Sequence, residues 1–344
     1  MLLAEEHTEE ALQPFKDRVA AAPMDFHALA RLVELLYRAG KLDDVPPLLE
    51  SAESRSARVR HAPGFKYCKG LYHKLVGDTV EALRWLNQAR RDGEWGRRAL
   101  THMIQLYLAP EAEEMWVERT GLARETYLQG LRAAASLMRE APMQPPDRDV
   151  KILEAYLQMA SGARAQVDAA IQSLLTIVKD DRDCVPALVA LCTAFMIQDQ
   201  VPKARNQLKR LGKMPFQHEH ASDFERAWLM LAELYVRSSK FDLAIELCKR
   251  ALQHNQSSTR AMEWLGHIYE KEASYVDAAQ WYEKAWEARK CSSPAIGFKL
   301  AFNYLKAKRF VETVDVCHKV LAKFPEYPRI RAEILQPARE GLRR

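Results

Sequence analysis

Residues 225–285 decide the fold and read ERAWLMLAELYVRSSKFDLAIELCKRALQHNQSSTRAMEWLGHIYEKEASYVDAAQWYEKA. Trp228, Leu231 and Tyr235 recur at the spacing that places apolar side chains on one face of a helix. Met262, Leu265 and Tyr269 repeat this spacing 34 residues later. A helical hairpin with such a face buries it only against the next hairpin. The stretch therefore predicts consecutive helical hairpins.

The small residue that lets the second helix of each hairpin approach the first marks the period of the repeat. It is found at Ala11, Val45, Ala82, Ala170, Ala204, Ala244, Ala278 and Thr313. Within these runs the gaps are 34 and 37 residues near the start, then 34, 40, 34 and 35. A period of about 34 residues and the pattern W-x2-L-G-x2-Y are typical of tetratricopeptide repeats. We predict an all-α, right-handed superhelical solenoid of antiparallel helix pairs.

Gly40, Gly77 and the pair Ser238-Ser239 mark turns inside the hairpins. The predicted domain organisation is a partial repeat (1–22), two repeats (23–94), a degenerate hairpin with an enlarged loop (95–148), two repeats (149–212), a linker (213–224), three repeats (225–328), and a capping helix with a tail (329–344). Because Ala11 falls at the middle of a repeat, residues 1–22 are expected to be the second helix of a truncated hairpin. This register suggests a carboxy-terminal fragment, or a short form, of a longer repeat protein.

Composition excludes several classes of function. The 344 residues are 48% hydrophobic with a net charge of only +5, whereas nucleic-acid binders usually carry a stronger and clustered positive charge. The six cysteines form no CxxC pair and suit reduced core positions of an intracellular protein. The apolar run from Cys184 to Ile197 is too short to span a bilayer. We expect a soluble, cytoplasmic protein.

No motif for catalysis or a cofactor is present. The sequence lacks GxxxxGK[ST], GxGxxG, HExxH and GxSxG. His218-Glu219-His220 has no third ligand at metal-site spacing, so we interpret it as a solvated loop. We therefore predict no enzyme activity, no cofactor and no metal.

Two basic stretches are more ambiguous. One comprises Lys203, Arg205, Lys209, Arg210 and Lys213, and the other comprises Lys306, Lys308, Arg309, Arg329, Arg331, Arg339, Arg343 and Arg344. A solvated outer helix face is the simpler interpretation. Docking to an acidic partner or to an anionic membrane surface is the alternative.

Partner-binding residues are predicted on the first helices of the hairpins, which line the concave surface of such solenoids. The candidates are Arg226, Glu233, Arg237, Arg260, Glu263, His267, Lys271, Phe298, Phe302 and Lys306. Phe298 and Phe302 are either exposed anchors or packed against the final helix. The Lys and Asn clamp with which co-chaperone repeats bind terminal carboxylates is absent, because its positions hold Leu229, Glu233, Glu263, His267, Phe298 and Phe302.

Several longer stretches carry a resemblance to one family. They are 65–72 (FKYCKGLY), 94–96 (EWG), 202–210 (PKARNQLKR), 277–279 (DAA), 299–309 (KLAFNYLKAKR) and 327–331 (YPRIR). In these stretches the chain resembles the carboxy-terminal portion of the tetratricopeptide repeat protein 21 family. The resemblance implies a subunit of intraflagellar transport complex A, located in the cytoplasm, the cilium and the ciliary base. It also implies other subunits of that complex, and ciliary cargo adaptors, as partners.

Three functions remain in competition at this point. The first is a structural scaffold that docks neighbouring transport subunits. The second is a peptide-binding adaptor or co-chaperone outside the cilium, against which the missing clamp argues. The third is a helical domain of an enzyme, against which the missing catalytic motifs argue.

Overall fold

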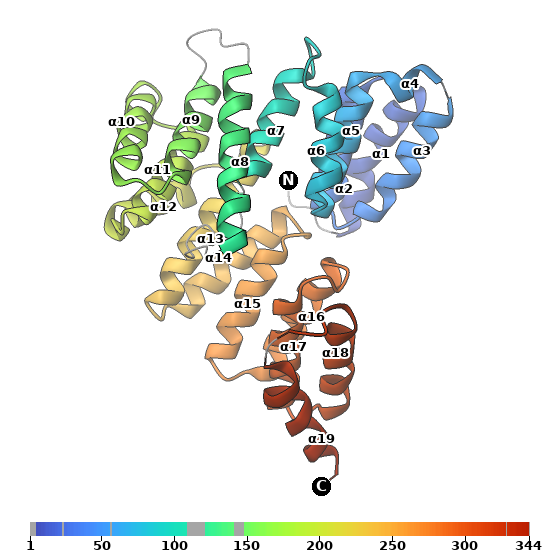
Figure 1. Cartoon of the computed structure of the whole chain (residues 1–344), viewed down its shortest axis with the longest axis vertical. Helices are drawn as coiled ribbons and strands as arrows, with labels where there is room; N and C mark the ends of the chain where they lie inside the picture. The colour runs from blue at the N-terminus through green and yellow to red at the C-terminus, as the bar shows by residue number, and fades with distance from the viewer. Residues whose placement is uncertain are drawn as a thin grey trace. The chain divides into compact units, whose positions relative to one another are not determined.

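The computed structural model describes residues 5–22, 24–55, 57–108, 121–140, 148–327 and 329–343, and within these ranges every regular element is helical (Figure 1). The chain forms two compact units, one that extends to Phe224 and one that begins at Glu225. The prediction of an all-α helical-repeat fold is confirmed within each unit.

The first unit is a series of helices that pack in chain order. They are α1 (Glu5–Ala21), α2 (Phe26–Arg38), η1 (Leu42–Asp44), α3 (Val45–Arg55), α4 (Ala57–His61), α5 (Pro63–Val76), α6 (Thr79–Ala89), α7 (Gly96–Leu108), α8 (Gly121–Glu140), α9 (Arg148–Ala160), α10 (Arg164–Asp180), α11 (Val185–Ile197), α12 (Val201–Lys213) and η3 (His218–His220). Hairpin partners such as α5 and α6 pack together, and each hairpin contacts the next, as α6 does α7. The predicted enlarged loop, 109–120, and the break at 141–147 lie outside the described residues.

The second unit continues the same arrangement. Its helices are α13 (Ala221–Arg237), whose first turn belongs to the first unit, α14 (Phe241–His254), α15 (Thr259–Lys271), α16 (Tyr275–Ala288), α17 (Pro294–Lys306), α18 (Phe310–Lys323), η4 (Ile330–Leu335) and α19 (Gln336–Leu342). The segment predicted to cap the last repeat forms η4 and α19, which pack on α18.

The small residues used to set the repeat register lie at helix contacts. Ala82, Ala170, Ala204, Ala244, Ala278 and Thr313 are all fully buried. On the facing helix α15, a Cβ added at Gly266 would lie 3.0 Å from the ring of Tyr282. Such short approaches between helices leave room only for small side chains, which explains why these positions recur with the period of the repeat.

The turns inside the hairpins share one backbone conformation. Gly40, Gly77 and Gly162 have positive φ, and so do Asp199, Ser239, Ala273 and Lys308 at the equivalent places. In the α15–α16 turn, the amide of Ser274 donates to the carbonyl of Tyr269 at 2.9 Å, a bond from residue i to i−5. This is the Schellman pattern, in which a left-handed residue ends the first helix and satisfies its last carbonyl groups.

The predicted linker 213–224 is largely structured. Lys213 ends α12, His218–His220 form η3, and Ala221 begins α13 four residues before the expected repeat start at Glu225. Ala221 and Phe224 are buried, and the Phe224 ring lies 5.6 Å from that of Phe216. We call residues 216–224 the strap.

Candidate functional site

The ten residues predicted to bind a partner lie on α13, α15 and α17 of the second unit. Arg237, Lys271 and Lys306 are exposed, and each is the last residue of its helix. Arg237 donates to Glu233 on the same helix at 2.5 Å, so part of its charge is compensated. Arg226, Arg260 and Glu263 are half-buried. Their role in binding stays a prediction.

His267, Phe298 and Phe302 are partly buried. Burial, together with nearby Lys299, lowers the pKa of His267, which keeps its ring neutral near pH 7. Phe298 packs against the core of the last repeat with its ring 6.1 Å from that of Tyr327. Phe302 also contacts this core and carries Lys306 over its ring at 5.4 Å. Both phenylalanines therefore serve the fold while leaving some ring surface accessible.

A polar cluster beside these residues was not selected from the sequence. Lys299 Nζ donates to Glu270 at 3.1 Å, and Asn303 Nδ2 donates to the same carboxylate at 3.0 Å. Asn303 is fully buried. The cluster joins α15 to α17, which is a structural role.

A groove of about 800 Å³ lies on the first unit, and we call it the inner groove. Its walls come from the first helices of successive hairpins, namely α2, α5, α7 and α9, with Pro186 of α11 and with His220 and Asp223 of the strap. This groove lies on first helices of the hairpins in the first unit, whereas the ten predicted partner residues all lie on first helices of the second unit.

A chain of hydrogen bonds joins α5 to α7 at the wall of the inner groove. Lys74 Nζ donates to His102 Nδ1 at 2.8 Å and to Gln105 Oε1 at 2.7 Å. Because an ammonium group can only donate, Nδ1 accepts and the proton of the neutral ring resides on Nε2. His102 Nε2 therefore donates to the Tyr67 hydroxyl oxygen at 2.9 Å. Burial, with the charges of Lys74 and Arg98, lowers the pKa of His102 to about 3.

A second group of side chains surrounds Trp95, which is buried. The His27 ring stacks on it at 4.4 Å, Tyr67 packs at 5.0 Å, and the Arg98 guanidinium lies 5.6 Å from its centroid. Arg98 Nη1 is 3.1 Å from His27 Nδ1, and His27 Nε2 is 2.7 Å from Glu94. An arginine cannot accept, so His27 accepts from Arg98 and donates to Glu94. Arg98 is thereby held in one orientation.

The strap reaches the far end of α2. Arg38 Nη2 donates to Ser222 Oγ at 3.0 Å, a contact between residues 184 positions apart. With His220 and Asp223 on its wall, the inner groove is partly covered by its own chain. This contact could not be predicted from the sequence, because the strap is polar and its partner lies on the second helix of the chain.

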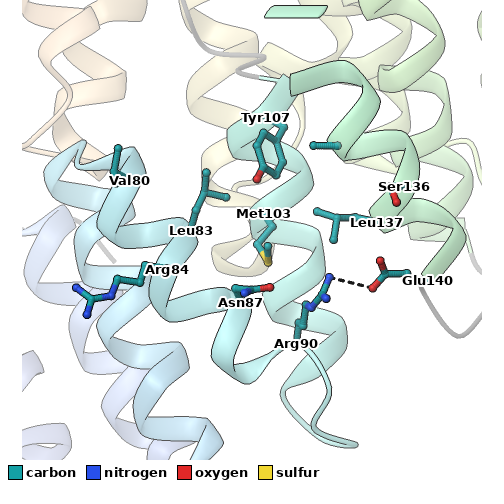
Figure 2. Close-up of a pocket in the computed structure, with 11 residues that line it drawn as sticks. Val80, Leu83, Arg84, Asn87, Arg90, Met103, Tyr107, Ser136, Leu137 and Glu140 are labelled. Carbon is teal, nitrogen blue, oxygen red and sulfur yellow. Dashed lines mark hydrogen bonds and ion pairs between the residues drawn. The ribbon is translucent and has the colours of Figure 1, made fainter. Parts of the chain in front are cut away.

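A second groove of about 550 Å³ lies between α6 and α8, with α7 as its floor (Figure 2). Val80, Leu83, Met103 and Leu137 make it largely apolar. Figure 2 shows the ion pair between Arg90 and Glu140 at one end, with 2.9 Å between nitrogen and oxygen.

Metal-ligand clusters and membrane-spanning helices also bear on function. In the part of the chain that the structure describes, no three His, Cys, Asp or Glu side chains gather as metal ligands would, and His218-Glu219-His220 is no exception. Among the described helices, none combines the length and the apolar character needed to cross a membrane.

Comparison with known proteins gives two family models. The model described as "Tetratricopeptide repeat protein 21 C-terminal ARM domain" matches residues 133–339. The model described as "TT21 fifth ARM repeats domain" matches residues 1–108. Together they include both grooves and all ten predicted partner residues.

Individual relatives agree with the family models. Human tetratricopeptide repeat protein 21A is 41% identical over 358 residues, which cover 100% of this chain and 27% of that protein. Human tetratricopeptide repeat protein 21B is 43% identical over 327 residues, 92% of this chain and 25% of that protein. The chain spans about a quarter of the length of these relatives. A crystal structure of a tetratricopeptide repeat protein from Parabacteroides merdae supports the fold alone, with 13% identity, a TM-score of 0.52, and coverage of 77% of this chain and 93% of that chain.

Proposed function

This chain belongs to the tetratricopeptide repeat protein 21 family, and on that basis we propose that it is a non-catalytic scaffold subunit of intraflagellar transport complex A. The chain is a helical-repeat scaffold of the kind that serves protein interactions. The role that we propose within this complex includes retrograde ciliary transport and trafficking of ciliary membrane cargo. Its proposed locations are the cytoplasm, the cilium and the ciliary base.

One observation carries the proposal. The two family models match residues 1–108 and 133–339, so nearly the whole chain aligns with domains of this family. Complex A membership is what the resemblance to this family implies. The proposed partners are accordingly the other complex A subunits, with ciliary cargo adaptors as further candidates.

The architecture supports a scaffold in physical terms. Successive hairpins expose one new surface per repeat, so a short chain presents an extended docking area. The two grooves are lined by side chains of several helices each, as partner sites on helical repeats are.

Affinity capture from ciliated cells tests the proposal. The tagged chain should recover complex A subunits, and a tagged co-chaperone repeat domain with an intact carboxylate clamp serves as the control. Recovery of chaperones alone, at the level of the control, would replace the scaffold with the adaptor function.

A further inference from the structure

We propose that the inner groove binds an acidic side chain of a partner segment, with the carboxylate received by the Tyr67 hydroxyl and the Arg98 guanidinium. The proposal deepens the scaffold function and rests on it, since it names the chemistry of the partner at one site. The occupant is an internal Asp or Glu of an extended segment.

Tyr67 supplies the first donor. Its side chain is only 4% exposed, and its hydroxyl oxygen already accepts from His102. The hydroxyl hydrogen is therefore available to donate, and the described residues offer it no acceptor. A buried donor without a partner is costly, and this one lies on the wall of a groove wide enough for a ligand.

Arg98 supplies the second donor and the charge. One N–H is used by His27, and no other acceptor for Arg98 is found among the described residues. Its guanidinium is exposed and held by His27 and Trp95, so little side-chain entropy is lost when a carboxylate binds. Tyr67 and Arg98 both pack against Trp95, and both line the inner groove.

The wall of the inner groove carries three arginines, Arg31, Arg97 and Arg98, and three carboxylates, Glu34, Asp149 and Asp223. Lys74 adds a further cation behind His102, which itself stays neutral. Glu34 accepts from Arg31 at 3.0 Å, and Glu94 lies 2.7 Å from His27 Nε2, so each of these carboxylates already has a partner. The preference for an anion therefore rests on the donors of Tyr67 and Arg98, with the charge of Lys74 behind His102, and not on an excess of cations along the wall.

The strap indicates the form of the occupant. Asp223 belongs to an internal stretch of chain and lines this groove, so one continuous segment already follows part of its wall. The groove also crosses four consecutive first helices, a geometry suited to a segment that runs through rather than ends inside. A terminal carboxylate is thus the less suitable ligand.

Fluorescence anisotropy on the full chain provides the test. The probes are labelled decapeptides with blocked termini, one alternating Glu with Leu and Ala, and one with Gln in place of each Glu. We expect the Glu peptide to bind and the Gln peptide to bind at least tenfold more weakly. Tyr67→Phe and Arg98→Gln should each weaken the Glu peptide about tenfold or more, as expected for loss of a hydrogen bond to a charged group.

Matched controls separate the site from general charge effects. Tyr72→Phe lies on the same helix α5, and Arg132→Gln removes an exposed cation on α8. Both should leave the affinity unchanged. Arg98→Lys, which retains the charge but loses the planar donor, should lie between wild type and Arg98→Gln.

Three results would overturn the proposal. They are equal binding of the Glu and Gln peptides, unchanged binding by a Tyr67→Phe variant with wild-type circular dichroism, or stronger binding of a Gln peptide with a free terminal carboxylate. Capture of complex A subunits from ciliated cells is a separate measurement. If complex A subunits are not captured but the Glu peptide still binds, the assigned complex is rejected and the site stands. If the subunits are captured but the Glu peptide does not bind, the site alone is rejected.

Discussion

Replacement of Gly70 by alanine tests how closely α5 and α6 approach each other. A Cβ added at Gly70 would lie 2.7 Å from Leu86 Cγ and 3.1 Å from the Leu86 backbone nitrogen. Leu86 is fully buried, so its side chain has little room to move aside. The backbone contact can be relieved only by a shift of one helix relative to the other.

The expected effect is the difference between two opposing terms. Alanine in place of glycine in a helix interior stabilises by about 1 kcal/mol. An extra methyl group in a packed core costs about 1–3 kcal/mol. Because one of the two contacts is with backbone, we place the cost in the upper part of that range. The first unit should therefore lose about 1–2 kcal/mol of stability.

Amide hydrogen exchange is the suitable assay, because a chain with two units need not unfold in one step. Amides of α5 and α6 should exchange about 5–30-fold faster in Gly70→Ala. Gly93→Ala is the control, since a Cβ there would meet nothing within 4 Å. It should leave exchange in both helices unchanged.

The opposite outcome has a clear meaning. If Gly70→Ala slows amide exchange, the gain in helix propensity is not opposed by a steric cost against Leu86. The close approach of α5 and α6 is then refuted. A second check uses Leu86→Ala, which by itself should cost about 2–5 kcal/mol. In that background Gly70→Ala should cost less than it does alone, because the clashing side chain is gone.

Three further predictions concern other parts of the chain. Ala273→Gly should raise the urea midpoint of unfolding, by a gain of up to about 1 kcal/mol, because Ala273 has φ of 59° in the left-handed region that glycine adopts freely. Ala278→Arg should lower the melting temperature markedly, since it overpacks a fully buried position and buries an unpaired charge; a variant that melts like the parent would show that the repeat register is wrong. His102 has a pKa of about 3 in the fold, below its ordinary value of about 6.5, so protonation favours the unfolded chain as pH falls below about 6.5. Its contribution to acid destabilisation should reach about 2 kcal/mol at pH 5, and His102→Gln should reduce the loss of urea stability between pH 7 and pH 5.

The repeat could be predicted from the sequence because its determinants are local. The recurring small residues, such as Ala204, Ala244 and Ala278, report the closest approach of two helices within one hairpin. Turns with glycine could also be recognised, as at Gly40 and Gly77. The turns at Asp199 and Lys308 could not, because the hydrogen bonds of the hairpin impose positive φ on residues that do not prefer it.

The inner groove could not be derived in the same way. Its donors, Tyr67 and Arg98, lie on helices that meet only in the folded unit, and the positions between them include the weakly patterned hairpin. His27, Tyr67 and His102 lie on three successive first helices, but they are the second, fifth and seventh residues of those helices, so no shared repeat position marks them. The sequence does not show which of these three side chains is exposed and which is held by other residues. The contacts that hold them are made by Lys74 and Trp95, which lie elsewhere in the chain.

The strap shows how a polar composition can conceal a structural role. Residues 213–224 contain Pro215 and two histidines, a composition that predicts a spacer. The buried residues Ala221 and Phe224, and the bond from Arg38 to Ser222, instead fix this segment to the rest of the first unit. A spacer tolerates changes in length and composition, whereas this segment should not, because a deletion would withdraw Phe224 from the core and Asp223 from the groove wall. The inner groove is thus lined by distant parts of one chain, and the partner surface that we propose there includes the strap as well as the repeats.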